Sequence, residues 1–375
     1  MRETTSRYRR IVVKAGTNVL TGGGDSLDLE VMASLVDQIS TLHRQGAEVM
    51  LVTSGAIAAG RQVLGRRRNG GDIPFRQVLA AVGQGRLMHT YEQLFEEHHI
   101  TVAQALLSRG DITDREGYLN VRNTLLALLE CQVVPIINEN DVVAVEEIGV
   151  EVFGDNDNLS AMVANLVDAD LLIILTDVGG LYTADPHEDS QARLIPRVER
   201  VDEAIEALAG ANHSARSRGG MQAKLEAVKL ATAFGVAVAL ANGREHGIVP
   251  RLVAGEPAGT FFAPTAARME SRKRWMLSGL STRGEIVVDA GAARALRRNH
   301  SSLLPAGVKE VRGEFRRGDI VLVVDAGGER VACGIVAYGA AEVAAIRGLR
   351  SDKIHEALGH QYGAEVLHRN NMVAL

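Results

Sequence analysis

Cysteine is scarce in this chain, with only Cys131 and Cys333 among its 375 residues. Two cysteines so far apart in sequence supply neither a disulfide framework nor the spacing of a zinc knuckle. Long apolar runs are also missing, because no stretch approaches the roughly 18 residues that a membrane-spanning helix needs. The apolar stretch behind the basic N-terminus stops at Lys14, which is too short for the core of a signal peptide. We therefore expect a cytoplasmic protein that does not associate with membranes.

Two common nucleotide-binding signatures are absent as well. The sequence contains no Walker arrangement of glycines and lysine, and no GxGxxG follows a strand-like run. Any nucleotide site therefore belongs to neither a P-loop nor a Rossmann fold. The chain also has no internal repeat and no low-complexity segment.

The composition is that of a globular protein, with 46% apolar and 23% charged residues. The length predicts two or three domains. Residues 1–265 hold 24 Lys+Arg against 34 Asp+Glu, whereas residues 266–375 hold 17 against 12. This split of net charge, −10 against +5, suggests two modules with different partners, or only drift in surface composition.

Short apolar runs alternate with amphipathic stretches over residues 1–265. The runs at 11–13, 49–52, 133–137 and 171–175 are typical of strands buried on both faces, as in a parallel sheet. Residues 28–44 have apolar side chains at helical spacing. This order predicts an open, mainly parallel sheet sandwiched by helices.

The pattern of apolar runs and turn residues changes after about residue 265. Strand-like runs at 285–289, 319–324 and 331–336 are separated by turn signals, and short helical stretches lie near 290–298 and 340–346. This pattern predicts a small, β-rich second domain over residues 276–375.

Ligands in open α/β sheets bind beyond the carboxyl ends of the strands, and polar residues follow each predicted strand of the first domain. They are Lys14-Ala15-Gly16-Thr17, Thr53-Ser54-Gly55, Asn138-Glu139-Asn140-Asp141 and Thr176-Asp177. Lys14 offers a point charge to a phosphate, and Gly16 lets the backbone approach a ligand closely. The alternative is that Lys14 is a solvated strand end.

A second phosphate-binding site is expected at Gly219-Gly220. The glycine pair precedes a predicted helix that runs to about Phe234, with Lys224 in its first turn, and such a helix start is an anion site. The alternative is a plain turn.

The segment Gly154-Asp155-Asn156-Asp157-Asn158-Leu159-Ser160 crowds more capping residues at a helix start than one helix needs. Asp157 can organise lysines and magnesium, and Asn156 can hold a substrate through its amide.

Together these motifs resemble the glutamate 5-kinases of the amino acid kinase superfamily. The matching stretches are residues 13–20, 52–60, 137–141, 154–160, 175–177, 180–186 and 219–221. The resemblance covers essentially the whole chain, and the second domain resembles the PUA module of bacterial members.

The resemblance implies roles for individual residues. Lys14 and Lys224 would flank the transferring phosphoryl group, with Asp157 orienting them, while Ser54, Asp141 and Asn156 match the glutamate-binding positions. The implied ATP-binding residues are Lys14, Gly16, Thr176, Asp177, Arg218, Gly219, Gly220, Met221, Gln222, Ala223 and Lys224. Mg2+ is expected with ATP, but no residue is assigned as a metal ligand. One departure is that Ser217 and Arg218 stand where the family usually has glycine and threonine.

The implied reaction is ATP-dependent phosphorylation of the side-chain carboxylate of L-glutamate, the first step of proline biosynthesis. The family implies inhibition by proline, a homo-oligomer, and coupling to glutamate-5-semialdehyde dehydrogenase. One alternative is a related kinase acting on acetylglutamate, aspartate, carbamate or UMP, against which the residue 138–141 motif and the PUA-like tail argue. Another is an RNA-binding PUA protein, against which the acidic first domain argues.

Overall fold

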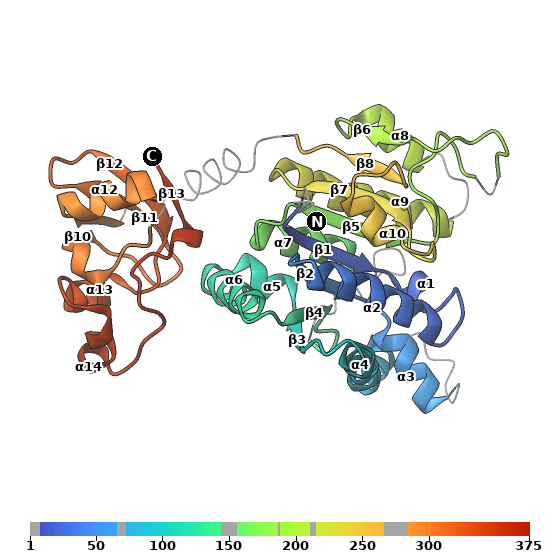
Figure 1. Ribbon diagram of the computed structural model, residues 1–375, viewed down its shortest axis with the longest axis horizontal. Coiled ribbons are helices and arrows are strands. Elements are labelled where there is room, and N and C mark those ends of the chain that lie inside the picture. The colour runs from blue at the N-terminus through green and yellow to red at the C-terminus, as the bar shows by residue number, and fades with distance from the viewer. Residues whose placement is uncertain are drawn as a thin grey trace. The chain divides into compact units, whose positions relative to one another are not determined.

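The computed structural model describes residues 8–65, 73–143, 156–186, 188–210, 215–265, 284–299 and 301–375. The chain divides into two compact units (Figure 1). The larger comprises Met1–Arg109 and Arg122–Arg268, and the smaller comprises Gly110–Val121 and Met269–Leu375. The short segment Gly110–Val121 therefore clusters with C-terminal residues, which the sequence did not indicate.

The larger unit is built on an eight-stranded sheet with the order β3-β4-β2-β1-β5-β7-β8-β6 (Figure 1). The strands are β1 (Arg10–Ala15), β2 (Glu48–Thr53), β3 (Val102–Leu107), β4 (Val134–Glu139), β5 (Leu171–Thr176), β6 (Arg197–Val198), β7 (Ala237–Asn242) and β8 (Thr260–Phe262). All neighbouring pairs are parallel except β7 and β8, which are antiparallel. The expected open, mainly parallel sheet is confirmed.

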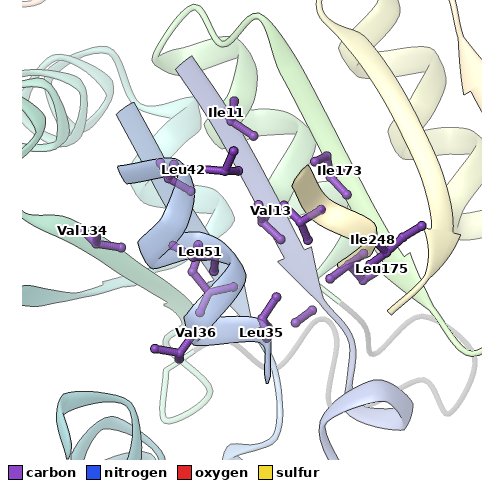
Figure 2. Packing of buried hydrophobic residues seen from close by; sticks show 14 of the residues in the cluster. Ile11, Val13, Leu35, Val36, Leu42, Leu51, Val134, Ile173, Leu175 and Ile248 are labelled. Atoms are coloured by element: carbon purple, nitrogen blue, oxygen red, sulfur yellow. The ribbon is translucent and has the colours of Figure 1, made fainter. Parts of the chain in front are cut away.

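Strand β1 lies in the middle of this sheet, paired with β2 on one side and β5 on the other. Its side chains alternate between the two faces, and Ile11 and Val13 belong to the core cluster that also holds Leu35 of α2 (Leu29–Arg44) and Ile173 of β5. Figure 2 shows these residues packed together. Lys14, one residue on from Val13, therefore faces the opposite side of the sheet.

Helices cover both faces of the sheet. Helices α2, α4 and α10 supply the core cluster on one face, while α7 packs against β1 and β5, and α9 packs against α7. The helices of this unit not yet bounded are α1 (Thr17–Leu20), α3 (Ala56–Leu64), α4 (Ile73–Glu96), α7 (Asp157–Leu166), α8 (Glu203–Gly210), α9 (Ala215–Ala233) and α10 (Ile248–Val253), and α6 (Arg115–Glu130) spans residues of both units.

Helices α3 and α4 touch through their backbones. A Cβ atom added at Gly83 of α4 would lie 1.8 Å from the carbonyl oxygen of Ala56, and one added at Gly60 of α3 would lie 2.0 Å from that of Leu79. Only glycine allows so close an approach. The crossing holds α4 directly over the turn that follows β2.

The smaller unit contains a five-stranded sheet with the order β10-β9-β11-β12-β13. The strands are β9 (Gly284–Val288), β10 (Val308–Gly313), β11 (Ile320–Asp325), β12 (Arg330–Ile335) and β13 (Met372–Ala374); the helices include α5 (Arg109–Thr113), α12 (Ala290–Asn299), α13 (Ala340–Ile346) and α14 (Ile354–Leu358). The three strands expected from the sequence are confirmed as β9, β11 and β12. No helix in the described part of the chain is long and apolar enough to cross a membrane.

Candidate active site

Two lysines form ion pairs with one aspartate between the sheet and its helices. Lys14 Nζ on β1 lies 2.8 Å from Asp157 Oδ1, and Lys224 Nζ on α9 lies 3.0 Å from Asp157 Oδ2. Lys14 is 0% exposed, Asp157 1% and Lys224 7%. Lys14 is therefore not a solvated strand end. Because the three side chains sum to one positive charge in a buried place, the arrangement favours an anionic ligand beside it.

The prediction that helix α9 begins after Gly219-Gly220 is wrong. Gly219 and Gly220 lie inside the helix, which begins at Ala215, so Lys224 lies more than two turns from the helix start instead of in the first turn. Alanine and arginine at 215, 216 and 218 are strong helix formers, and a glycine inside a helix costs only about 1 kcal/mol. Lys224 Nζ also lies 3.4 Å from the carbonyl oxygen of Gly220.

The expected nucleotide loop is therefore a helical segment. Gly220, Met221, Gln222, Ala223 and Lys224 follow one another along α9. The backbones of Arg218 and Gly219 belong to the same helix, and their side chains lie outside what the structure describes. Gly154 and Asp155 of the acidic motif also lie outside the described residues.

An amide network joins the ends of β2 and β4 to the start of α7. Asn156 Nδ2 donates to the carbonyl oxygen of Thr53 at 2.5 Å and to Asn138 Oδ1 at 2.7 Å, and Ser54 Oγ lies 3.4 Å away. Beneath it, the hydroxyls of Thr53 and Tyr91 are 2.8 Å apart. Burial raises the pKa of Tyr91 well above its usual value, so the phenol stays neutral.

A cavity of about 210 Å³ opens beside this network. Clefts for drug-sized ligands have volumes of roughly 300–1,000 Å³, and this cavity is smaller. Its volume therefore suits a smaller metabolite. Ser54, Asp141 and Asn156, the three residues expected to bind substrate, all line it. The remaining lining residues are Thr17, Gly24, Asp25, Gly55, Ala56, Ile57, Ala58, Arg61, Arg76, Asn138 and Glu139.

The N-terminus of α3 forms part of the cavity wall. Gly55 adopts a left-handed conformation with φ of 101° as the cap residue before the helix, which brings the first-turn residues Ala56, Ile57 and Ala58 to the cavity. Unpaired N–H groups and the helix dipole at such a terminus favour a negatively charged group.

Sequence reasoning missed the two cavity arginines. Arg61 lies on α3 and Arg76 on α4. Neither follows a strand directly, so the pattern of polar residues at strand ends does not include them. Arg61 belongs to the helix that begins at the cavity, and Arg76 belongs to α4, which crosses that helix.

The pair expected to contact nucleotide lies at the end of β5. Thr176 is buried and donates from Oγ1 to Asp177 Oδ1 at 3.0 Å, and Asn18 Nδ2 donates to Asp177 Oδ2 at 3.0 Å. Gly16 is buried and is the cap residue of α1. These contacts tie the end of β5 to the turn after β1, the strand that also carries Lys14.

Comparisons with known proteins show the family of the chain. The model of the amino acid kinase family matches residues 9–242, and the model of the PUA domain matches residues 284–358. A glutamate 5-kinase of Dehalococcoides mccartyi is 53% identical over 368 residues, covering 98% of this chain and 99% of the relative. A glutamate 5-kinase of Herpetosiphon aurantiacus is 52% identical over 367 residues, covering 98% of each chain.

Among solved structures, the UMP kinase of Bacillus anthracis aligns with a TM-score of 0.46 at 16% identity, covering 69% of this chain and 97% of that one. The full-length relatives are far closer, so they decide the assignment. The resemblance expected from the motifs is confirmed: the chain belongs to the glutamate 5-kinases of the amino acid kinase family and carries a PUA domain.

Proposed function

We propose that this protein transfers the γ-phosphoryl group of ATP to the side-chain carboxylate of L-glutamate, forming L-glutamyl 5-phosphate in the first step of proline biosynthesis. The observation that carries the proposal is the buried Lys14–Asp157–Lys224 group, whose Asp157 directly follows Asn156 of the cavity wall. The identity of about 50% to full-length glutamate 5-kinases supports the choice of substrate.

The reaction needs no general base. A side-chain carboxylate with a pKa of about 4.3 is already ionised at neutral pH and can attack the γ-phosphorus directly. Catalysis then consists of holding two anions in line and neutralising the charge that spreads over the transferring oxygens. Lys14 and Lys224 supply that charge, and Asp157 fixes both ammonium groups by accepting one on each carboxylate oxygen.

The cavity offers complementary groups for glutamate. Asp141 supplies a carboxylate for the α-ammonium group, and Arg61 and Arg76 supply positive charge for the α-carboxylate. Ser54 and Asn156 also line the cavity, and Asn156 directly precedes Asp157 in the chain. The proposal requires the side-chain carboxylate of glutamate to point toward the two lysines.

ATP would bind along the edge formed by the ends of β1 and β5 and by α9. Thr176, Asp177, Gly16 and the α9 segment from Arg218 to Lys224 are the residues that we assign to it. Mg2+ bound with ATP would neutralise charge on the β- and γ-phosphates. Such an ion takes one or two carboxylates and otherwise phosphate oxygens and water, and Asp157 is a buried carboxylate of this site.

The product places the protein in a sequence of reactions. An acyl phosphate hydrolyses readily, so rapid transfer to a reductase, glutamate-5-semialdehyde dehydrogenase, is the expected coupling. We assign catalysis to residues 1–265 in a cytoplasmic homo-oligomer, and a regulatory or assembly role, in preference to RNA binding, to the PUA-like residues 276–375.

The decisive experiment is phosphoryl transfer by the purified protein with hydroxylamine trapping of the acyl phosphate. Glutamate, acetylglutamate and aspartate are compared at equal concentration with ATP and Mg2+. We expect hydroxamate from glutamate alone. Equal or greater product from acetylglutamate or aspartate would assign the protein to one of the related kinases instead.

A further inference from the structure

A one-way chain of amide hydrogen bonds runs from the backbone of β2 to Gln84 on α4. Asn156 Nδ2 donates to Thr53 O at 2.5 Å and to Asn138 Oδ1 at 2.7 Å, and Asn138 Nδ2 donates to Gln84 Oε1 at 2.7 Å. Asn138 is 3% exposed and Asn156 5% exposed. We call this chain the amide relay.

The direction of the relay is dictated from its β2 end. The backbone oxygen of Thr53 can only accept, so the Asn156 atom beside it must be the NH2 group. That NH2 group also faces Asn138, so the facing atom of Asn138 must be its oxygen. The NH2 group of Asn138 is then left to face Gln84, and Gln84 must present its oxygen.

The far end of the relay is consistent with an imposed orientation. Gln84 Nε2 is buried and has no hydrogen-bond partner in the described chain. No hydrogen bond from Nε2 to another described residue therefore holds the Gln84 amide with its oxygen toward Asn138. The orientation follows from what Asn138 requires.

The relay decides what the cavity offers to a ligand. Asn138 and Asn156 line the cavity, whereas Gln84 is not among the lining residues. With Nδ2 of Asn156 committed to Thr53 and Asn138, the polar atom that Asn156 retains is Oδ1, which can only accept a hydrogen bond. An acceptor in the same cavity as the carboxylate of Asp141 suits the donor group of a substrate, its ammonium.

We propose that Gln84 is a positioning residue that fixes the amide orientation of Asn138 and Asn156, and so the affinity of the cavity for the amino-acid substrate. The inference rests on the proposed function, because it assigns the cavity to glutamate. Gln84 acts through Asn138, so it touches neither glutamate nor the phosphoryl group.

Three substitutions of similar length separate hydrogen-bond direction from packing. Gln84→Glu keeps an acceptor facing Asn138 and preserves the relay. Gln84→Met removes the acceptor and leaves the buried NH2 group of Asn138 unpaired. Gln84→Lys presents only donors, which forces the oxygen of Asn138 outward and sets its NH2 group against that of Asn156.

The test measures KM for glutamate, KM for ATP and kcat for each variant by hydroxamate formation. We expect KM for glutamate near wild type in Gln84→Glu, roughly ten-fold higher in Gln84→Met and higher still in Gln84→Lys, since an unpaired buried donor is costly. KM for ATP should change less than two-fold throughout. A space-filling role predicts a different order, with Gln84→Met best and both charged variants worse, and that order would overturn the proposal.

Failure of the relay and failure of the proposed function are distinguishable. Wild-type protein that makes no hydroxamate from glutamate would overturn the function. The relay is then tested by melting temperature alone, which should fall in the order Gln84→Glu, Gln84→Met, Gln84→Lys. Equal melting temperatures for all three variants would overturn the relay.

Discussion

The crossing of α3 and α4 can be tested with one pair of glycine substitutions. A Cβ atom at Gly83 would lie 1.8 Å from the carbonyl oxygen of Ala56 and 2.4 Å from the amide nitrogen of Gly60, whereas ordinary contact begins at 3.4 Å. The helices must therefore separate by about 1.6 Å, the difference between 3.4 and 1.8 Å. Because both obstructing atoms belong to backbone, no side-chain rotation relieves the clash.

Gly83→Ala should lower the free energy of unfolding by about 3 kcal/mol through this overpacking. Ala56 lines the cavity and Gln84 adjoins Gly83, so separating the helices should also raise KM for glutamate. The readouts are urea unfolding of the whole chain, followed by circular dichroism, and hydroxamate kinetics.

Gly85→Ala on the same helix is the matched control. No atom lies within 4 Å of a Cβ added there, so only the gain in helix propensity remains, and the variant should be about 1 kcal/mol more stable than wild type. That propensity gain is common to both variants, so their difference isolates the clash. Equal stability of the two variants would refute the close crossing.

The remaining predictions concern the charges of the site and the second domain. Lys14→Ala or Lys224→Ala should each lower kcat roughly 100-fold or more, because both charges stabilise the transition state. The control is Lys229→Ala, on the same helix as Lys224 but paired with a surface glutamate, which should keep kcat within two-fold. A near-normal kcat for Lys224→Ala would contradict the role of that lysine. Asp141→Asn should raise KM for glutamate much more than KM for ATP, measured by varying each substrate in turn, and an equal rise in both would point to a folding defect. A chain ending at Pro264 should stay soluble and transfer phosphate while its response to proline or Mg2+ changes; a folded but inactive truncation would show that the C-terminal residues help to form the active site.

Hydrophobic patterning made much of the fold predictable. Residues 11–13 and 171–175 are continuous apolar runs, and both became central parallel strands because only a strand covered on both faces tolerates such a run. The apolar pattern of the sequence does not predict β3 or β7. Strand β3 has partly exposed positions, and β7 is rich in alanine, so neither shows the β-branched pattern that marked the others.

The start of α9 illustrates a limit of local signals. Glycines often stand at helix ends, so Gly219-Gly220 predicts a helix boundary. In the structure the preceding residues extend the helix through both glycines. Propensity is a weak guide when neighbouring residues and tertiary packing favour continuing the helix.

The sequence by itself determined which chemistry the chain could carry. Polar residues at the ends of parallel strands gather at one edge of the sheet, so the sequence predicts that Lys14, Ser54 and Thr176 lie at a common site. What only the tertiary structure decided is how side chains from distant segments meet. Lys224 reaches Asp157 because α9 packs on α7, and Gln84 reaches Asn138 because two glycines let α4 cross α3 backbone to backbone. No periodicity or motif in the sequence predicts either contact, since each depends on the packing of elements far apart in sequence.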